Sequence, residues 1–177
     1  MRQYIRDRTA GATYFFTINL LNRQSNLLVE HITALRAAYN STQKSMPFTL
    51  HAMVVLPDHL HMLLTLPEND VNYPQRISQM KSRFSRALPE IENINESRQH
   101  KGERGIWQRR YWEHRIRDEL DYQRHMDYIH YNPVKHGYVN AAKDWSYSTF
   151  HQCVRDGIYA EDWAAQDDFG VIGKNDA

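Results

Sequence analysis

The sequence has little cysteine and no long apolar run. Cys153 is the single cysteine among 177 residues, which excludes an internal disulfide framework and fits a reducing compartment. No apolar stretch approaches the ~20 residues that cross a bilayer, and residues 1–8 lack the apolar centre of a signal peptide. We therefore expect a cytoplasmic protein with no membrane partner, and we assign Cys153 no functional role.

The length indicates one domain. With 177 residues, 41% of them hydrophobic, the chain can bury a core without metal or disulfide support. We see no internal repeats. We expect a single domain over residues 1–155, followed by an acidic C-terminal tail over residues 156–177.

The net charge is +1, but the charged residues are distributed unevenly along the chain. Residues 76–117 contain eleven Lys or Arg and five Glu, whereas residues 155–177 contain two basic and six acidic residues. The basic belt is interleaved with Phe84, Trp107, Tyr111 and Trp112. Cations that meet phosphates beside rings that stack on unpaired bases favour a nucleic-acid partner. A solvated, salt-bridged surface is an equally good explanation of the belt alone.

Hydrophobic patterning predicts the order strand, helix, strand, strand, helix, strand. The predicted ranges are 12–20, 26–39, 48–56, 59–67, 74–88 and 107–116. Asn26 is a candidate cap of the first helix, a polar break follows it at residues 40–44, and Pro57 and Asp58 make a tight hairpin turn. This order is that of a ferredoxin-like α+β sandwich, a central antiparallel sheet with helices on one face.

Three further segments complete the prediction. The helix over residues 74–88 is apolar on one side and cationic on its outer face, and residues 91–105 read as an exposed loop. Asp118 can cap an extra helix through residue 132, which Pro133 should bend or end, with Gly137 as a stop. A short helix after residue 150 leads into the tail.

Two histidines flank one leucine in the third predicted strand. His59 and His61 share a face because strand side chains alternate, so two imidazoles could bind one cation. Tyr128 and Asn132 are four apart on the predicted extra helix and share a face there, roughly 6 Å apart at Cβ. If this helix packs beside the sheet, a nucleophile and a further ligand converge on an exposed histidine face.

These motifs carry a family resemblance. Residues 14–17 (YFFT), 54–61 (VVLPDHLH), 111–114 (YWEH) and 127–137 (DYIHYNPVKHG) resemble, in this order, the single-tyrosine HUH transposases, specifically the REP-associated tyrosine transposases of bacteria. The resemblance implies that His59 and His61 bind Mg²⁺ or Mn²⁺, with Asn132 as third ligand, and that Tyr128 is the nucleophile. It implies a single-stranded DNA substrate containing a palindromic hairpin, a monomeric enzyme and a place on the bacterial nucleoid.

The chemistry agrees with this resemblance. A phenol with a pKa near 10 is a poor nucleophile at neutral pH, so it needs a polarised phosphate and help in losing its proton. A metal on the scissile phosphate supplies the polarisation. A 5′-phosphotyrosine link conserves the phosphodiester energy, which favours strand transfer over one-way hydrolysis.

Several site assignments have alternatives. The histidine pair alone is also typical of a half-exposed strand surface, and Asn132 also precedes a proline as in many turns. Rival nucleophiles are Tyr122, Tyr131 and Tyr138, although Tyr131 should point about 100° away from Asn132 around a helix. His125, one turn before Tyr128, could assist proton transfer as a supporting residue or could be a surface histidine. Supporting or DNA-contacting roles are expected for His114 and Glu113.

Basic residues of the belt are the candidates for holding the hairpin and its flanks. They are Arg76, Lys81, Arg83, Arg86, Arg109 and Arg110. The acidic segment 162–168 could fold over this groove and compete with DNA, or it could simply be a solubilising end.

Two other functions compete with strand transfer. A histidine-triad-like nucleotide hydrolase also places histidines alternately on a strand, but residue 63 is Leu where a third His is needed. A catalytically silent, hairpin-binding repressor built on an inactivated transposase is harder to exclude. The presence of both histidines, Tyr128 and Asn132 argues against such decay.

Overall fold

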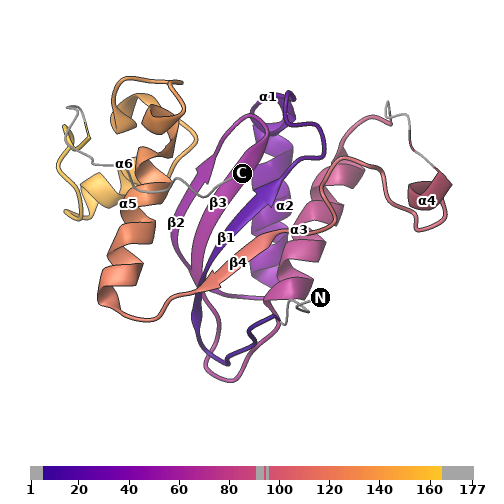
Figure 1. The fold of residues 1–177 in the computed structure, drawn as a ribbon, viewed down its shortest axis with the longest axis horizontal. Helices are drawn as coiled ribbons and strands as arrows, with labels where there is room; N and C mark the ends of the chain where they lie inside the picture. The colour runs from indigo at the N-terminus through magenta and orange to yellow at the C-terminus, as the bar shows by residue number, and fades with distance from the viewer. Residues whose placement is uncertain (1–5, 91–93, 95, 165–177) are drawn as a thin grey trace, which may run out of the picture.

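The computed structural model describes residues 6–90, 94 and 96–164, and its centre is a four-stranded antiparallel sheet (Figure 1). The strands are β1 (Thr13–Asn19), β2 (Thr49–Val55), β3 (His59–Thr65) and β4 (Trp112–Arg115). Their spatial order is β2-β3-β1-β4, so the histidine strand is central and β4 is an edge. The order of strands and helices confirms the predicted ferredoxin-like α+β architecture.

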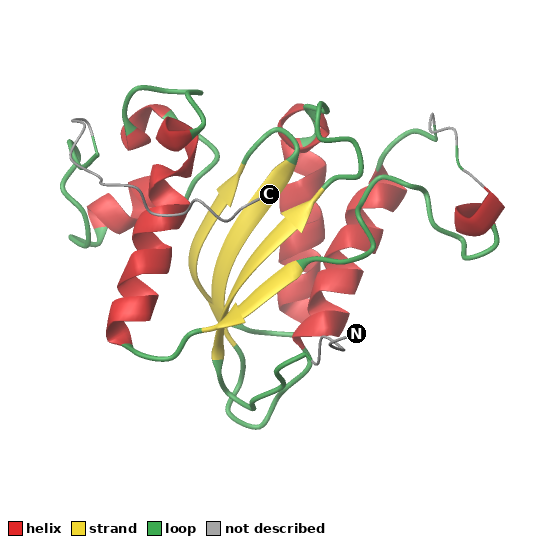
Figure 2. Cartoon of the chain, viewed as in Figure 1, coloured by secondary structure: helices red, strands yellow, loops and turns green. Residues whose placement is uncertain are grey.

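Helices cover both faces of the sheet (Figure 2). They are α1 (Leu27–Glu30), α2 (Ile32–Ser45), α3 (Tyr73–Ala87), α4 (Glu96–Gln99), α5 (Glu119–Lys135) and α6 (Phe150–Arg155), with a 3₁₀ turn at Ala142–Asp144. Helices α2 and α3 pack side by side on one face, and α5 packs against β2 and β3 on the other. Within the described ranges, no helix is long and apolar enough to span a membrane.

The alternation of strand side chains divides the interior into two cores. Tyr14 and Phe16 of β1 face α2 and α3 together with Met62 of β3. Phe15 and Leu63 face the opposite way and pack with residues of α5 and α6. A sheet buried on both faces differs from the predicted sandwich with helices on one side, because α5 and α6 add a third layer over part of the sheet.

The first helical segment differs from the prediction. A break at His31 separates α1 from α2, and α2 continues to Ser45, so the polar break predicted at residues 40–44 is wrong. The hydroxyl of Thr42 donates to the Ala38 carbonyl, which lets a polar residue remain within a helix. Asn26 precedes α1, but its side chain makes no capping hydrogen bond.

The C-terminal part of the fold extends beyond the predicted domain boundary at residue 155. Tyr159 is buried, its hydroxyl donates to Asp127, and its ring packs against Trp163 at 4.5 Å. The packed chain therefore continues to residue 164. The rest of the predicted acidic tail, residues 165–177, lies outside the described residues, as do residues 91–93 and 95 of the predicted loop.

Candidate active site

The histidine pair lies at the start of β3, directly after the hairpin turn. His61 pairs with Thr17 and His59 with Asn19 of β1, and the two imidazole centroids are 5.0 Å apart. His59 is 4% exposed and His61 is 1% exposed, so the predicted exposed histidine face is wrong. Because α5 packs over this end of the sheet, the pair lies in a closed, water-poor environment.

An acid orients His59. Nδ1 of His59 lies 2.7 Å from Oδ1 of Asp58, and Arg23 donates to the other oxygen of the same carboxylate. Although burial alone would raise it, these hydrogen bonds hold the pKa of Asp58 below its ordinary value, so the group is an anion. A carboxylate on Nδ1 leaves Nε2 as the ligand nitrogen, an arrangement common around metal-binding histidines.

A hydroxyl fixes the second imidazole. Nδ1 of His61 is 2.9 Å from Oγ1 of Thr17, and its buried Nε2 has no hydrogen-bond partner among the described residues. Burial lowers the pKa of His61 well below its ordinary value, and burial also lowers the pKa of His59. Both rings are therefore neutral near pH 7, as metal binding requires.

Helix α5 brings Tyr128 and Asn132 to the histidines. The Asp118 side chain accepts a hydrogen bond from the Asp121 backbone N–H, which confirms the predicted cap at the start of the helix. The rings of Tyr128 and His61 are 5.2 Å apart. Asn132, one turn later, is fully buried, and in the described part of the chain neither of its side-chain polar atoms has a partner.

Unpartnered buried polar atoms are costly and call for an explanation. Here they are an imidazole nitrogen of His61 and the amide oxygen and nitrogen of Asn132. Two imidazole nitrogens and an amide oxygen are suitable ligands for a divalent ion such as Mn²⁺, and less typical of Mg²⁺, which favours oxygen. The residues present therefore fit the metal that the resemblance implies.

Two residues at the C-terminal end of α5, which the sequence does not single out, extend the same surface. Nζ of Lys135 lies 4.8 Å from the ring centre of Tyr128, and the ring of His136 lies 5.5 Å from that of His59. Both follow from helical spacing, since positions 128, 132, 135 and 136 share a face. Pro133 did not end the helix, which continues to Lys135 before Gly137 takes a φ of +72°.

The rival tyrosines have other neighbours. Tyr122 packs on His51 at 5.4 Å, Tyr138 packs on Trp145 at 5.3 Å, and Tyr131 packs against the core on the α5 side. Tyr128, in contrast, makes a ring contact with His61 at 5.2 Å.

The three predicted supporting residues divide between the two faces of β4. His114 and His125 stack at 4.8 Å on the α5 side, and both interact with the carboxylate of Asp121. The ligand atoms of His114, Asp121 and His125 lie within 4.8 Å of one another, close enough for a metal. Arg117, however, already donates to the Asp121 carboxylate at 2.9 Å. We read this cluster as a structural link between β4 and α5.

Glu113 does not belong to the histidine face. It pairs with Phe16 and is buried on the α3 side, where the Tyr73 hydroxyl lies 3.4 Å from its carboxylate. Strand alternation places it away from His61, so a direct role at the site is not supported.

The predicted DNA-binding cations also occupy different environments. Arg76 is buried and donates to the Met46 and Pro47 carbonyls and to Asp70, so the expectation that it lies on an exposed cationic face is wrong. Nζ of Lys81 donates to the Gln108 carbonyl, and burial lowers the pKa of Lys81 to about 8. Arg83 contacts α2, Arg109 pairs with Glu103, and Arg86 and Arg110 are exposed.

A basic cleft of about 650 Å³ separates α3 from residues 98–109. Its cationic lining residues are Lys81, Arg86, Arg98, Lys101, Arg104 and Arg109. The guanidinium of Arg104 donates to the Leu88 and Pro89 carbonyls and so holds this segment against the end of α3. The cleft lies on the α3 side, and residues 109–111 connect it to β4.

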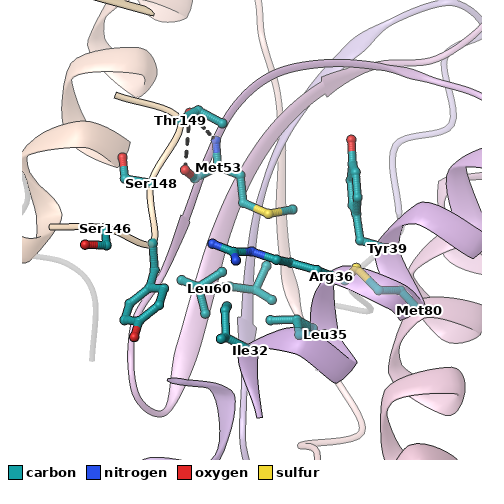
Figure 3. Close-up of a pocket in the computed structure, with 12 residues that line it drawn as sticks. Ile32, Leu35, Arg36, Tyr39, Met53, Leu60, Met80, Ser146, Ser148 and Thr149 are labelled. Atoms are coloured by element: carbon teal, nitrogen blue, oxygen red, sulfur yellow. Dashed lines mark hydrogen bonds between the residues drawn. The ribbon is translucent and has the colours of Figure 1, made fainter. Parts of the chain in front are cut away.

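A separate apolar cavity of about 160 Å³ lies beside β2, between α2 and residues 146–149 (Figure 3). The hydroxyl of Thr149 binds the Met53 backbone at its edge, and the side chain of Arg36 crosses it. It contains none of the predicted site residues.

Comparison with known proteins shows the family to which this chain belongs. The family model described as "Transposase IS200 like" matches residues 10–132. A protein of Haemophilus influenzae named as a REP-associated tyrosine transposase is 51% identical over 98% of this chain and 99% of its own length. The REP-associated tyrosine transposase of Escherichia coli is 43% identical over 93% and 92%.

A solved structure shows the same fold. It is described as a REP-associated tyrosine transposase bound to a REP hairpin, is 41% identical, covers 98% of this chain and 100% of its own, and superposes with a TM-score of 0.82. The chain therefore belongs to the IS200-like transposase family and, within it, to the REP-associated tyrosine transposases, enzymes that cut and rejoin single-stranded DNA.

Proposed function

We propose that this chain cleaves and rejoins single-stranded DNA beside a palindromic hairpin, with Tyr128 as nucleophile. The observation that carries the proposal is the ring contact between Tyr128 and His61, one helical turn from the buried amide of Asn132, which has no hydrogen-bond partner among the described residues. The hairpin substrate is inferred from the relatives, one of which is described as bound to a REP hairpin. The same kinship favours action on chromosomal repeats in the bacterial cytoplasm, by a monomer.

The chemical step balances as a transesterification. The Tyr128 oxygen bonds to the scissile phosphorus, the bond to the 3′ oxygen breaks, and the phenolic proton is released, while the 3′ oxygen leaves as a hydroxyl. A divalent ion held by His59, His61 and Asn132 would polarise the phosphate and offset charge on the leaving oxygen. Asp58 and Thr17 hold the two neutral imidazoles in the orientation that metal binding requires.

Remaining residues have supporting roles in this proposal. Lys135, over the Tyr128 ring, stabilises negative charge that develops at the phenol and phosphate. His114 and His125 position the helix and do not touch the reacting atoms. Five cations are retained as DNA contacts: Lys81, Arg83, Arg86, Arg109 and Arg110.

The test uses labelled single-stranded hairpin oligonucleotides from the source genome, incubated with Mn²⁺ or Mg²⁺ and run on denaturing gels. We expect a covalent adduct that requires metal, disappears with chelator and is absent in Tyr128→Phe. Tyr138→Phe is the matched control, since Tyr138 is an exposed tyrosine beyond the same helix, and it should retain the adduct. Tight hairpin binding without an adduct under any metal would support the repressor instead.

A further inference from the structure

Trp112 presents an aromatic ring to solvent beside the histidine pair. It is the first residue of β4, and 48% of it is exposed. Its ring lies parallel to that of His114, at 5.8 Å and 6°, and His114 in turn stacks on His125 at 4.8 Å and 17°. Three near-parallel rings thus form a stack that starts at His125 of α5 and ends at the exposed indole of Trp112.

The strand register places this indole next to the site. Thr17 pairs with Trp112 on one side and with His61 on the other, and its hydroxyl binds His61. Trp112 and His61 are therefore two strand spacings apart, roughly 10 Å, on one face of the sheet. Phe15 lies between Trp112 and the candidate nucleophile, with its ring centre 5.7 Å from that of Trp112 and 5.8 Å from that of Tyr128.

The surrounding charge favours a nucleic acid over a protein partner. Arg110 is exposed two residues before Trp112, and residues 109–111 lead back to the basic cleft. Arg115 and Arg117 are also exposed, but they pair with Asp7 and Asp121. An exposed indole close in the chain to a basic cleft is an arrangement that single-strand-binding surfaces use, where bases stack on rings while cations meet the phosphates. A site for protein contact would favour a broader apolar surface with fewer charges.

We propose that Trp112 is a stacking platform for one unpaired base of the DNA strand held at the histidine pair. The base would extend the stack of His125, His114 and Trp112 by one ring and so fix the strand near Tyr128. This inference rests on the proposed function, because it requires single-stranded DNA at the site, but it concerns binding and not cleavage.

The experiment measures affinity in a Tyr128→Phe background, in which bound DNA is not cut. Hairpin oligonucleotides with single-stranded flanks are titrated, each with an abasic residue at one flank position. We expect Trp112→Ala to weaken binding of the intact strand by about tenfold and Trp112→Phe to weaken it less. For one flank position, the abasic oligonucleotide should bind the parent chain more weakly by the same factor. Its affinity should then not fall further in Trp112→Ala.

The control is Ile158→Ala, which removes an exposed apolar side chain from the far end of the chain and should leave affinity unchanged. Equal affinities for Trp112→Ala and its parent, or additive losses at every abasic position, would overturn the stacking role. A change in sedimenting mass in Trp112→Ala without a change in DNA affinity would make the indole a protein contact instead. Failure of the proposed function shows separately, as absence of an adduct with the unsubstituted chain, which keeps Tyr128.

Discussion

The carboxylate of Asp58 lies 2.7 Å from Nδ1 of His59, the residue that follows it in the chain. Asp58 lies in the hairpin turn and His59 is the first residue of β3. The carboxylate that orients the metal-ligand candidate His59 therefore comes from the neighbouring residue in the sequence. Arg23 closes the other side of the carboxylate and ties it to the loop after β1.

Asp58→Asn should weaken divalent-metal binding. An amide keeps the shape but removes the charge that supports His59, and loss of such a partner typically costs 10–100-fold in affinity. Binding of Mn²⁺ can be followed from the electron paramagnetic resonance signal of the free ion. Asp156→Asn, an exposed acid on the C-terminal side of α6, is the control, and equal affinities for both variants would remove Asp58 from the site.

Lys135→Met should slow cleavage. The substitution keeps the aliphatic stem over Tyr128 and removes the ammonium, so we expect the single-turnover rate at saturating DNA to fall by at least about tenfold. Lys143→Met, which changes an exposed lysine of the 3₁₀ turn, should have little effect. If both variants cleave at the parent rate, Lys135 does not act on the reaction.

The caps of two helices give a matched pair of stability predictions. Asp118→Ala should lower the free energy of unfolding by about 1 kcal/mol, because the carboxylate accepts from the first turn of α5. Asn26→Ala should change it much less, since Asn26 makes no such bond. Urea denaturation followed by circular dichroism measures both, and equal losses would contradict the assignment.

His130 predicts a loss of stability in acid. Burial lowers its pKa to about 4, against an ordinary value of 6.5. Between these values the unfolded chain binds more protons than the native one, so stability falls as the pH falls through this window, by up to about 3 kcal/mol at its lower end. The stability contributed by neutral His130 is fully present above pH 6.5.

The measurement is urea denaturation at a series of pH values from 7 to 4. His130→Gln can keep a hydrogen bond to Thr149, the partner of His130 at 2.9 Å, and should show a shallower dependence on pH. Parallel curves for the variant and its parent would show that another group controls acid unfolding.

The acidic tail remains a predicted inhibitor. Deleting residues 165–177 leaves the packed Trp163 and Ala164 in place, which a deletion after Tyr159 would not. We expect hairpin affinity to rise by at least about threefold at low salt, with the gain shrinking as ionic strength increases. Unchanged affinity at low salt would reject inhibition by charge.

Local patterns predicted what depends on local geometry. The alternation that places His59 and His61 together and the helical spacing of Tyr128 and Asn132 both follow from backbone periods. That the histidine pair and the tyrosine–asparagine pair lie close together depends on the tertiary structure. Residue spacing alone did not predict this proximity, whereas the family resemblance implied it.

The predictions that are wrong concern residues whose burial or facing direction depends on tertiary packing. Arg76 looks like any cation on an amphipathic helix, and only the carbonyls of the chain after α2 make its burial favourable. Glu113 occurs in a motif with His114, but neighbours in a strand face opposite ways, so adjacency in the sequence separated them in space. The sequence predicts a turn at Asp58, but the hydrogen bond of its side chain to His59 depends on the orientation of both side chains, which residue spacing does not predict.

The turn before β3 has a further evolutionary consequence. Three residues, Leu56, Pro57 and Asp58, join β2 to β3, and the Leu56 N–H donates to the His59 carbonyl across the turn. Inserting one residue that slipped β3 would rotate both imidazoles to the α3 side, because the side-chain period is two. Homologues should therefore vary in the composition of this turn but not in its length, whereas changes in length should accumulate between α3 and β4.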